Sequence, residues 1–308
     1  MNKSTVELLL GDFSSGWAHY EYRWRTDSAE VYRHAGIPAL TDLRQVAGKR
    51  ILAWSEQGLG DTIQFSRYVR MLAEAGAEVV FEVQAALRGL FAGQMGTAVI
   101  SMGEDPGRID FQTPLLNLPR LFGTTESSVP GETPYLKAQP DVIAHWRQRL
   151  LSNDRRPNIG LICSGNARFK RDSLRSIALE AFAPIFGLGR VFLIQKEIRE
   201  KDAAYLHLRP DVLTVLGEEL KGFEGTAAVL ECMDLVVSVD TAVAHLAGAL
   251  GRPLYIMLPF MPDWRWGLDK EHTPWYPDAP LFRQGEALQW EEPIARVAQG
   301  IRSRFPGA

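Results

Sequence analysis

The chain has 308 residues, of which 46% are hydrophobic and 23% are charged, and its formal net charge is −3. This length is enough for two domains of ordinary size, and the composition is that of a soluble globular protein. The small negative charge gives no electrostatic reason to expect nucleic acid or an anionic membrane as a partner, and no apolar run approaches the roughly 20 residues that span a bilayer. Cys163 and Cys232 lie far apart without metal-ligand spacing, which favours a reducing cytoplasmic location.

The first part of the chain predicts a helical segment followed by a βα domain. Residues 1–46 are rich in aromatic side chains, and we expect a helical N-terminal extension that packs on the first domain. Residues 47–140 form the predicted first domain. In it, strands 50–54 and 78–83 flank a helix from Asp61 to about residue 75, the pattern of a βαβ unit. Its last part, 124–140, contains three prolines and is predicted to link the two domains.

Residues 141–308 predict a second domain of the same kind. Predicted strands cover residues 159–163, 191–195, 212–215 and 235–239, and a final helix covers 289–304, which packs either on its own domain or back on the first. The predicted fold class is therefore α/β, with two Rossmann-like βαβ domains that face each other across a cleft.

The segment after the strand 235–239 is the first candidate site. Asp240 is a good N-cap residue, and Gly251 with Pro253 would end the helix that follows. Unpaired N–H groups at a helix N-terminus, placed at the carboxyl end of a parallel strand, suit a phosphate. Thr241 and His245 share one face of this helix. The alternative is an ordinary strand–helix unit with a buried histidine.

The turn Gly58-Leu59-Gly60-Asp61 is the second candidate site. Its glycines permit a sharp turn, and we expect Asp61 to be the helix N-cap. A carboxylate at the mouth of a cleft can also accept a proton from a hydroxyl group. A dinucleotide fingerprint is an alternative, with Glu82 near the expected position of a ribose-binding acid, but the third glycine is missing because residue 63 is isoleucine.

A basic loop forms the third candidate site. It runs from Ser164 to Ser176 and holds four cations, which a diphosphate or solvent would have to compensate. Lys196, after another strand, either reaches the same phosphate or is an ordinary surface lysine. The segment 259–277 carries Trp264, Trp266, Trp275 and Tyr276. These side chains stack on sugars or are buried struts between the domains, the role that we expect for at least two of them.

No metal site is expected, because the histidines are scattered and there is no Asp-x-Asp motif. The charge of a bound diphosphate would then be neutralised by helix N–H groups, His245 and basic side chains.

The segment Asp240-Thr241-Ala242-x-x-His245 resembles the donor-site motif of the bacterial heptosyltransferases, Asp-[Ser/Thr]-Gly-x-x-His. Other segments resemble the glycosyltransferase domains that follow tetratricopeptide repeats in bacterial proteins. They are Gly11-Asp12-Phe13, Gly16-Trp17, Tyr20-Glu21-Tyr22-Arg23-Trp24, Trp54-Ser55-Glu56-Gln57-Gly58-Leu59-Gly60-Asp61, Ser164-Gly165-Asn166 and Pro262-Asp263-Trp264-Arg265-Trp266. The resemblance extends from about residue 8 to near the end of the chain.

This resemblance implies a metal-independent GT-B glycosyltransferase without a cofactor, which moves a sugar from a nucleotide-diphosphate sugar to a protein, lipopolysaccharide or other saccharide. It implies that Asp61 is the catalytic base and that the acceptor lies near Gln57, Gly58, Gly60 and Gln64. The implied donor residues are Ser164, Gly165, Asn166, Lys170, Arg171, Arg175, Lys196, Asp240, Thr241, Ala242 and His245.

Two features of the resemblance leave alternatives open. The related proteins often have a histidine at the position of Phe169. Their repeats precede the enzyme, and we expect that here the repeats are absent or lie on another chain. The alternative functions are an inactive relative that binds a glycan or a partner, and a nucleotide-sugar epimerase. Turnover of a nucleotide sugar would exclude the first alternative, and release of a free modified sugar without an acceptor would favour the second.

Overall fold

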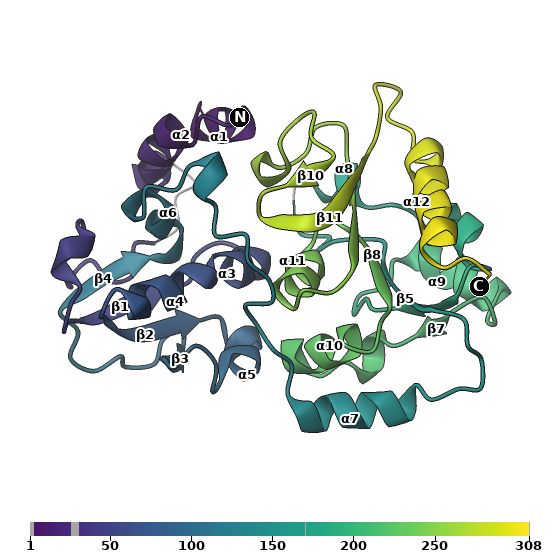
Figure 1. The fold of residues 1–308 in the computed structure, drawn as a ribbon, viewed down its shortest axis with the longest axis horizontal. Coiled ribbons are helices and arrows are strands. Elements are labelled where there is room, and N and C mark those ends of the chain that lie inside the picture. The colour runs from purple at the N-terminus through teal and green to yellow at the C-terminus, as the bar shows by residue number, and fades with distance from the viewer. Residues whose placement is uncertain (1–2, 26–30, 170, 308) are drawn as a thin grey trace.

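The computed structural model describes residues 3–25, 31–169 and 171–307. Two parallel-sheet domains lie side by side, the first at the left of Figure 1 and the second at the right. The first sheet has four strands in the order β3-β2-β1-β4, and the second has seven in the order β10-β11-β9-β8-β5-β6-β7. Neighbouring strands are parallel except for the β10–β11 pair.

The first sheet is built from short apolar runs that are buried in the domain. Its strands are β1 (Arg50–Trp54), β2 (Glu78–Val83), β3 (Ala98–Ser101) and β4 (Phe111–Pro114). The helices of this domain are α3 (Leu59–Phe65), α4 (Arg67–Glu74), α5 (Arg88–Phe91) and α6 (Leu118–Leu121). The sequence predicts one helix from Asp61 to about residue 75, but Ser66 separates α3 from α4, and its hydroxyl donates to the Ile63 carbonyl at 2.8 Å.

The second sheet has β8 near its centre. Its strands are β5 (Asn158–Ile162), β6 (Arg190–Leu193), β7 (Thr214–Val215), β8 (Leu235–Val239), β9 (Leu254–Leu258), β10 (His272–Thr273) and β11 (Tyr276–Arg283). The helices are α7 (Pro140–Arg149), α8 (Asp172–Arg175), α9 (Glu200–Leu208), α10 (Gly222–Leu230), α11 (Ala242–Ala249) and α12 (Glu291–Arg304). β8 is buried along its whole length, as expected for a central parallel strand.

The last helix, α12, belongs to the second domain. Its apolar face, with Ile294, Val297 and Ile301, joins the core cluster that holds Phe182 and Ile185. The alternative that this helix packs back on the first domain is therefore wrong.

The N-terminal segment is helical only in part. It begins with α1 (Lys3–Leu9), α2 (Phe13–Tyr20) and the 3-10 helix η1 (Glu21–Arg25). Further along, Ala39 pairs with Gln112 of β4, and the Leu40 N–H donates to the Gln112 carbonyl at 2.8 Å. The expectation of a helical extension through residue 46 is wrong there, because the open edge of β4 offers backbone partners that an extended segment satisfies.

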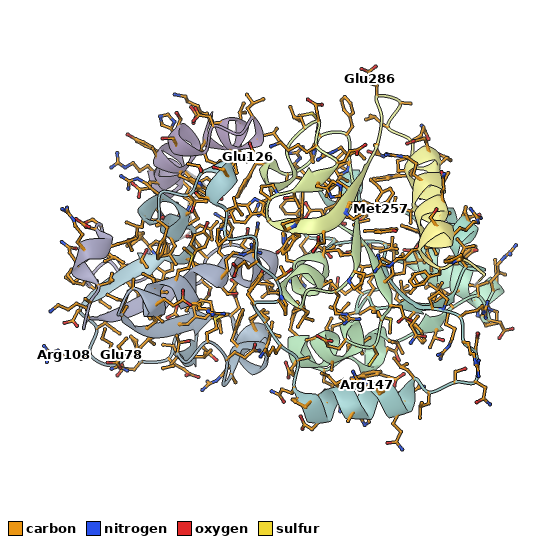
Figure 2. All side chains as sticks on the ribbon, in the orientation of Figure 1. Glu78, Arg108, Glu126, Arg147, Met257 and Glu286 are labelled. Atoms are coloured by element: carbon orange, nitrogen blue, oxygen red, sulfur yellow. The ribbon has the colours of Figure 1, made fainter. Side chains whose placement is uncertain are left out.

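Aromatic side chains join the two domains. Side chains fill the space between the two ribbons (Figure 2). Trp264 from the second domain meets Trp17 of α2, with ring centroids 5.3 Å apart, and Trp275 meets Phe65 of α3 at 5.4 Å. Trp264, Trp266, Trp275 and Tyr276 are all buried, which agrees with the interpretation of at least two of them as struts.

Candidate functional site

A cleft of about 710 Å³ lies between the domains. The first domain contributes the turn from Gln57 to Asp61. The second contributes residues at the carboxyl ends of β5, β6 and β8, the edge at which open α/β sheets bind their ligands. The lining residues from the second domain include Ser164, Gly165, Asn166, Phe169, Arg175, Gln195, Lys196, Glu197, Phe223, Asp240, Thr241, Ala242, Val243, His245, Asp263 and Arg265.

The N-terminus of α11 opens into this cleft. Its N-cap is Thr241, whose hydroxyl accepts from the Ala244 N–H at 3.4 Å. The prediction of Asp240 as N-cap is therefore wrong by one residue, and the Asp240 carbonyl instead accepts from Arg175 at 2.7 Å. The Thr241 hydroxyl is used for capping, so an anion would meet the backbone N–H groups of Ala242 and Val243.

His245 is a buried, neutral member of this wall. Its Nδ1 lies 3.0 Å from the Tyr276 hydroxyl, and its ring stacks on Trp266 with centroids 5.4 Å apart. Burial, together with the charges of nearby arginines, holds the pKa of the imidazole well below its usual value. A Tyr276 hydroxyl that donates to Nδ1 leaves the imidazole proton on Nε2, which lies 4.0 Å from an Asp240 oxygen. His245 can thus offer an N–H donor but not a positive charge.

Helices α3 and α11, which begin at the two candidate sites, come into contact at Gly60. A Cβ at this position would lie 2.9 Å from the His245 ring and 3.3 Å from Ala242 Cα. Only a residue without a side chain allows α3 and α11 to approach so closely. Gly60 therefore brings the turn of the first domain against the N-terminus of α11 in the second.

Asp61 is not the N-cap of α3, contrary to the prediction. The N-cap is Gly58, and Asp61 is the third helical residue, whose Oδ2 accepts from the Gly58 N–H at 2.9 Å. Its Oδ1 accepts from Arg265 of the second domain. Burial raises the pKa of the Asp61 carboxyl, and the Arg265 charge opposes that rise. Asp61 thus caps its helix from within the first turn and still lines the cleft.

Of the other residues predicted to lie near the sugar acceptor, some line the cleft and one is buried in the interior. Gln57 and Gly58 are exposed at the cleft, and Gln57 takes φ = 60°, the left-handed region that favours glycine. Gln64 is fully buried and does not line the cleft. Its side-chain oxygen accepts a hydrogen bond from Arg265 Nε at 2.6 Å. The prediction that Gln64 lies at the binding site of the sugar acceptor is therefore wrong.

The basic loop places one described cation in the cleft. Arg175 lines it, with its guanidinium 4.7 Å from the centre of the Phe169 ring. Arg171 is exposed and does not line the cleft, so its predicted phosphate contact finds no support, and Lys170 lies outside the described residues. The charge of Arg175 is balanced by Asp172, which accepts from its Nε at 3.2 Å and also from Arg199. A carboxylate within the loop therefore compensates the charge of Arg175, the described loop cation that lines the cleft.

The start of the loop is held by hydrogen bonds. Gln195 accepts from the Ser164 N–H at 3.0 Å and donates to the Ser164 hydroxyl at 2.7 Å. Gly165 is needed here, since a Cβ would lie 2.3 Å from an Asp172 oxygen. Asn166 and Lys196 are exposed at the cleft, where both can reach a ligand.

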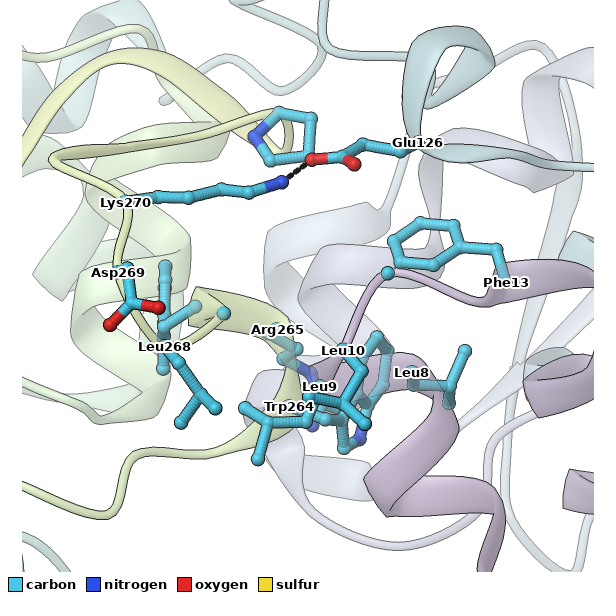
Figure 3. Close-up of a pocket in the computed structure, with 14 residues that line it drawn as sticks. Leu8, Leu9, Leu10, Phe13, Glu126, Trp264, Arg265, Leu268, Asp269 and Lys270 are labelled. Carbon is cyan, nitrogen blue, oxygen red and sulfur yellow. Dashed lines mark ion pairs between the residues drawn. The ribbon is translucent and has the colours of Figure 1, made fainter.

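A second, smaller pocket of about 200 Å³ shares Arg265 with the cleft. It is lined by Leu8, Leu9, Leu10, Gly11 and Phe13 from the N-terminal helices, by Glu126, and by residues 264–270 and Pro274 (Figure 3). The Lys270 ammonium group pairs with the Glu126 carboxylate across the pocket. This ion pair is another link between the domains.

The dinucleotide interpretation is contradicted at Glu82. Its side chain is buried and accepts from Arg33 at 2.6 Å, and it also lies 3.1 Å from His34 Nε2. A carboxylate that is paired in this way and only 1% exposed is not available to a ribose.

Two kinds of feature are absent from the described residues. No three His, Cys, Asp or Glu side chains in residues 3–25, 31–169 and 171–307 are grouped as metal ligands. Within the same part of the chain, no helix has the length and apolar character needed to cross a membrane.

Comparison with known sequences finds one family model that matches part of the second domain and one curated relative. Residues 195–256 match the model of the family described as "Glycosyltransferase family 9 (heptosyltransferase)". This segment contains Lys196, Asp240 and His245. Protein FlbA of Caulobacter vibrioides is 27% identical over an alignment of 330 residues. The alignment covers 97% of this chain and 54% of FlbA. The chain therefore spans about half the length of that curated relative.

Solved structures show the fold. A glycosyl transferase family 9 protein from Veillonella parvula matches with a TM-score of 0.62 at 13% identity, over 84% of this chain and 99% of that one. The E. coli heptosyltransferase WaaC with ADP matches with a TM-score of 0.54 at 15% identity, over 83% of this chain and all of WaaC. The chain has a GT-B-like α/β fold, which confirms the predicted fold class.

Proposed function

We propose that this chain is a glycosyltransferase that moves a sugar from a nucleotide-diphosphate sugar to an acceptor. The observation that carries the proposal is the convergence of unlike groups on one cleft. The α11 N-terminus, Arg175 and Lys196 provide positive potential from the second domain, and the Asp61 carboxylate faces the same cleft from the first. The positive groups of the second domain suit a diphosphate, and the carboxylate of the first domain can take the proton of an attacking hydroxyl.

The comparisons support the donor side of this proposal. The family match covers the strand β8, the α11 N-terminus and Lys196. A neighbour with the same fold was solved with ADP, so a nucleoside diphosphate is the first ligand to test. We infer that the diphosphate lies against Ala242 and Val243, with Arg175 and Lys196 as charged partners.

Asp61 is the proposed general base. One of its oxygens is occupied by the Gly58 N–H and the other by Arg265, and 19% of its side chain is exposed. A carboxyl whose pKa is raised by burial is a better proton acceptor than a solvated one. The acceptor hydroxyl would approach from the exposed side of the Gln57–Asp61 turn.

A thermal-shift series tests the donor site. We expect at least one of ADP, UDP, GDP and CDP to stabilise the protein, by about 2.7 kcal/mol at 100 times its dissociation constant. Inorganic sulfate at the same ionic strength is the control for general anion effects. If no nucleoside diphosphate or nucleotide sugar shifts the melting temperature at millimolar concentration, the donor site is wrong.

We propose further that the diphosphate is bound without a metal, because helix N–H groups and two basic side chains can stabilise its charge. In the same series, stabilisation should persist in EDTA. Loss of binding in EDTA that magnesium or manganese restores would contradict this part of the proposal.

Asp240 predicts a pH dependence of binding. Burial raises the pKa of its carboxyl to about 6, with a contribution from the charge of Asp263. Above pH 6 the ionised carboxylate therefore opposes a diphosphate at α11, and below pH 6 the neutral form does not. We expect Asp240→Asn to bind the nucleoside diphosphate about tenfold more tightly than wild type at pH 8.

This gain should shrink as the pH falls through 6. Calorimetry measures the affinities of Asp240→Asn and of wild type at each pH. Their ratio does not depend on the titration of the ligand, because that titration affects both proteins equally. A ratio that does not change between pH 5 and pH 8 would show that Asp240 does not titrate beside the ligand.

A further inference from the structure

Arg265 reaches from one domain to the other. It belongs to the 3-10 helix η8 (Trp264–Trp266), which follows β9 in the second domain. Its Nη2 donates to Asp61 Oδ1, and its Nε donates to Gln64 Oε1 at 2.6 Å. Asp61 and Gln64 lie three residues apart on α3, so one guanidinium group binds one face of this helix at two points.

Its own segment holds the guanidinium rigidly. Nη1 donates to Asp263 Oδ1 at 2.7 Å, and the planar group lies 4.3 Å from the centre of the Trp264 ring. Arg265 is only 9% exposed. The side chain therefore has little freedom, and the orientation that it imposes on α3 is well defined.

The two contacts of Asp61 leave a defined part of its carboxylate free. Oδ2 is oriented by the Gly58 N–H from the same helix, and Oδ1 is oriented by Arg265 from the other domain. With both oxygens oriented, the remaining lone pairs keep a constant direction at the cleft. This arrangement exists only while the two domains are in contact.

We propose that Arg265 is a positioning residue, which holds the Asp61 carboxylate in place across the domain boundary and so completes the base only when both domains meet. This inference rests on the proposed function, because it assigns Arg265 a role in sugar transfer. Its physical part, the link between Arg265 and Asp61, can be measured without any transfer.

The charges around Asp61 make that link measurable. Arg265 is the nearby cation that favours the ionised carboxylate, and Asp263 from the same segment opposes it. Glu56 after β1 and Tyr20 of α2 also interact with the Asp61 charge. Removal of Arg265 leaves the burial and the acidic neighbours in place. The pKa of Asp61 should then rise by about one unit or more.

The experiment compares three variants by carbon-13 NMR of aspartate-labelled full chain, with Asp61→Asn used to assign the signal. Arg265→Met should raise the apparent pKa of Asp61, whereas Arg265→Lys keeps a charge and should leave it within about half a unit of wild type. Arg67→Met is the matched control. Arg67 is also a buried arginine between the domains, but it donates to the backbone carbonyls of Gln64, Pro130 and Trp275 and not to Asp61. The control should leave the Asp61 titration unchanged.

Transfer kinetics add the functional part once an acceptor is known. The low-pH limb of the pH profile of kcat/KM should shift to higher pH in Arg265→Met and remain at the wild-type pH in Arg265→Lys. The lysine variant should lose about tenfold in kcat with the KM for the nucleotide sugar unchanged, since one point charge does not orient the carboxylate.

An unchanged Asp61 titration in Arg265→Met, or an equal shift in Arg67→Met, would overturn the link. If Arg265→Met does not fold, a lysine variant with wild-type kcat overturns the positioning role. If no nucleoside diphosphate binds, the proposed function fails, while the NMR comparison still decides whether Arg265 controls Asp61.

Discussion

Replacement of Asp61 by asparagine is expected to slow sugar transfer by about 10²–10⁴-fold, the usual contribution of general acid–base catalysis. The affinity for the nucleoside diphosphate should remain nearly unchanged. The amide oxygen of the asparagine can still accept from the Gly58 N–H, the contact that Asp61 makes at 2.9 Å, but the amide cannot take a proton from the acceptor. Transfer rates and calorimetric affinities, measured side by side, check both statements.

Asp42→Asn is the matched control for this variant. Asp42 also caps a helix, the short 3-10 helix η2 (Leu43–Gln45) of the N-terminal segment, and it pairs with Arg44, but it does not line the cleft. Its variant should keep wild-type transfer. A fully active Asp61→Asn would reduce Asp61 to a helix cap, and an Asp61→Asn that loses nucleotide affinity would place Asp61 in the donor site instead.

Trp275→Ala is expected to lower the free energy of unfolding by about 3–5 kcal/mol, the usual cost of a buried aromatic truncation. Trp275 is fully buried, and its ring packs against Phe13, Phe65 and Trp264. Phe13 belongs to the N-terminal segment and Phe65 to the first domain, so the cavity would open where these parts meet the second domain. Denaturant titration measures the change.

Tyr22→Ala provides the comparison, because Tyr22 is 55% exposed and its truncation should cost less than about 0.5 kcal/mol. Should Trp275→Ala cost no more than this surface variant, the aromatic contact between the domains would contribute little to stability.

Three strands were predicted most accurately, whereas β3, β4, β9, β10 and β11 were not predicted individually. Strands 50–54, 78–83 and 235–239 were predicted with the bounds that the structure has, because each is a short, mostly apolar run that ends near glycine or polar residues. The helix starts were less predictable. Asp240 and Thr241 are both good N-cap residues. Thr241 is the N-cap in the structure, in which Arg175 donates to the Asp240 carbonyl. That contact joins distant parts of the chain, so local pattern could not reveal it.

The connections between the candidate sites could not be predicted from local pattern. Arg265 and Asp61 are 204 residues apart, and nothing in the Trp264-Arg265-Trp266 pattern indicates which carboxylate the arginine meets. Asp172 was visible within the basic loop, yet its role in neutralising Arg175 and Arg199 depends on burial. One signal for Arg265 was available: an arginine between two tryptophans is suited to cation–π packing in a buried place.

Hydrogen–deuterium exchange tests the central claim most directly, because it shows where a nucleoside diphosphate binds. The measurement compares the free protein with the protein saturated by the nucleoside diphosphate of highest affinity. The account predicts slower exchange at residues 164–166, 169, 195–197 and 240–243, which line the second-domain side of the cleft. Protection confined to the smaller pocket, at residues 8–13 and 264–270, or no protection at all, would contradict it.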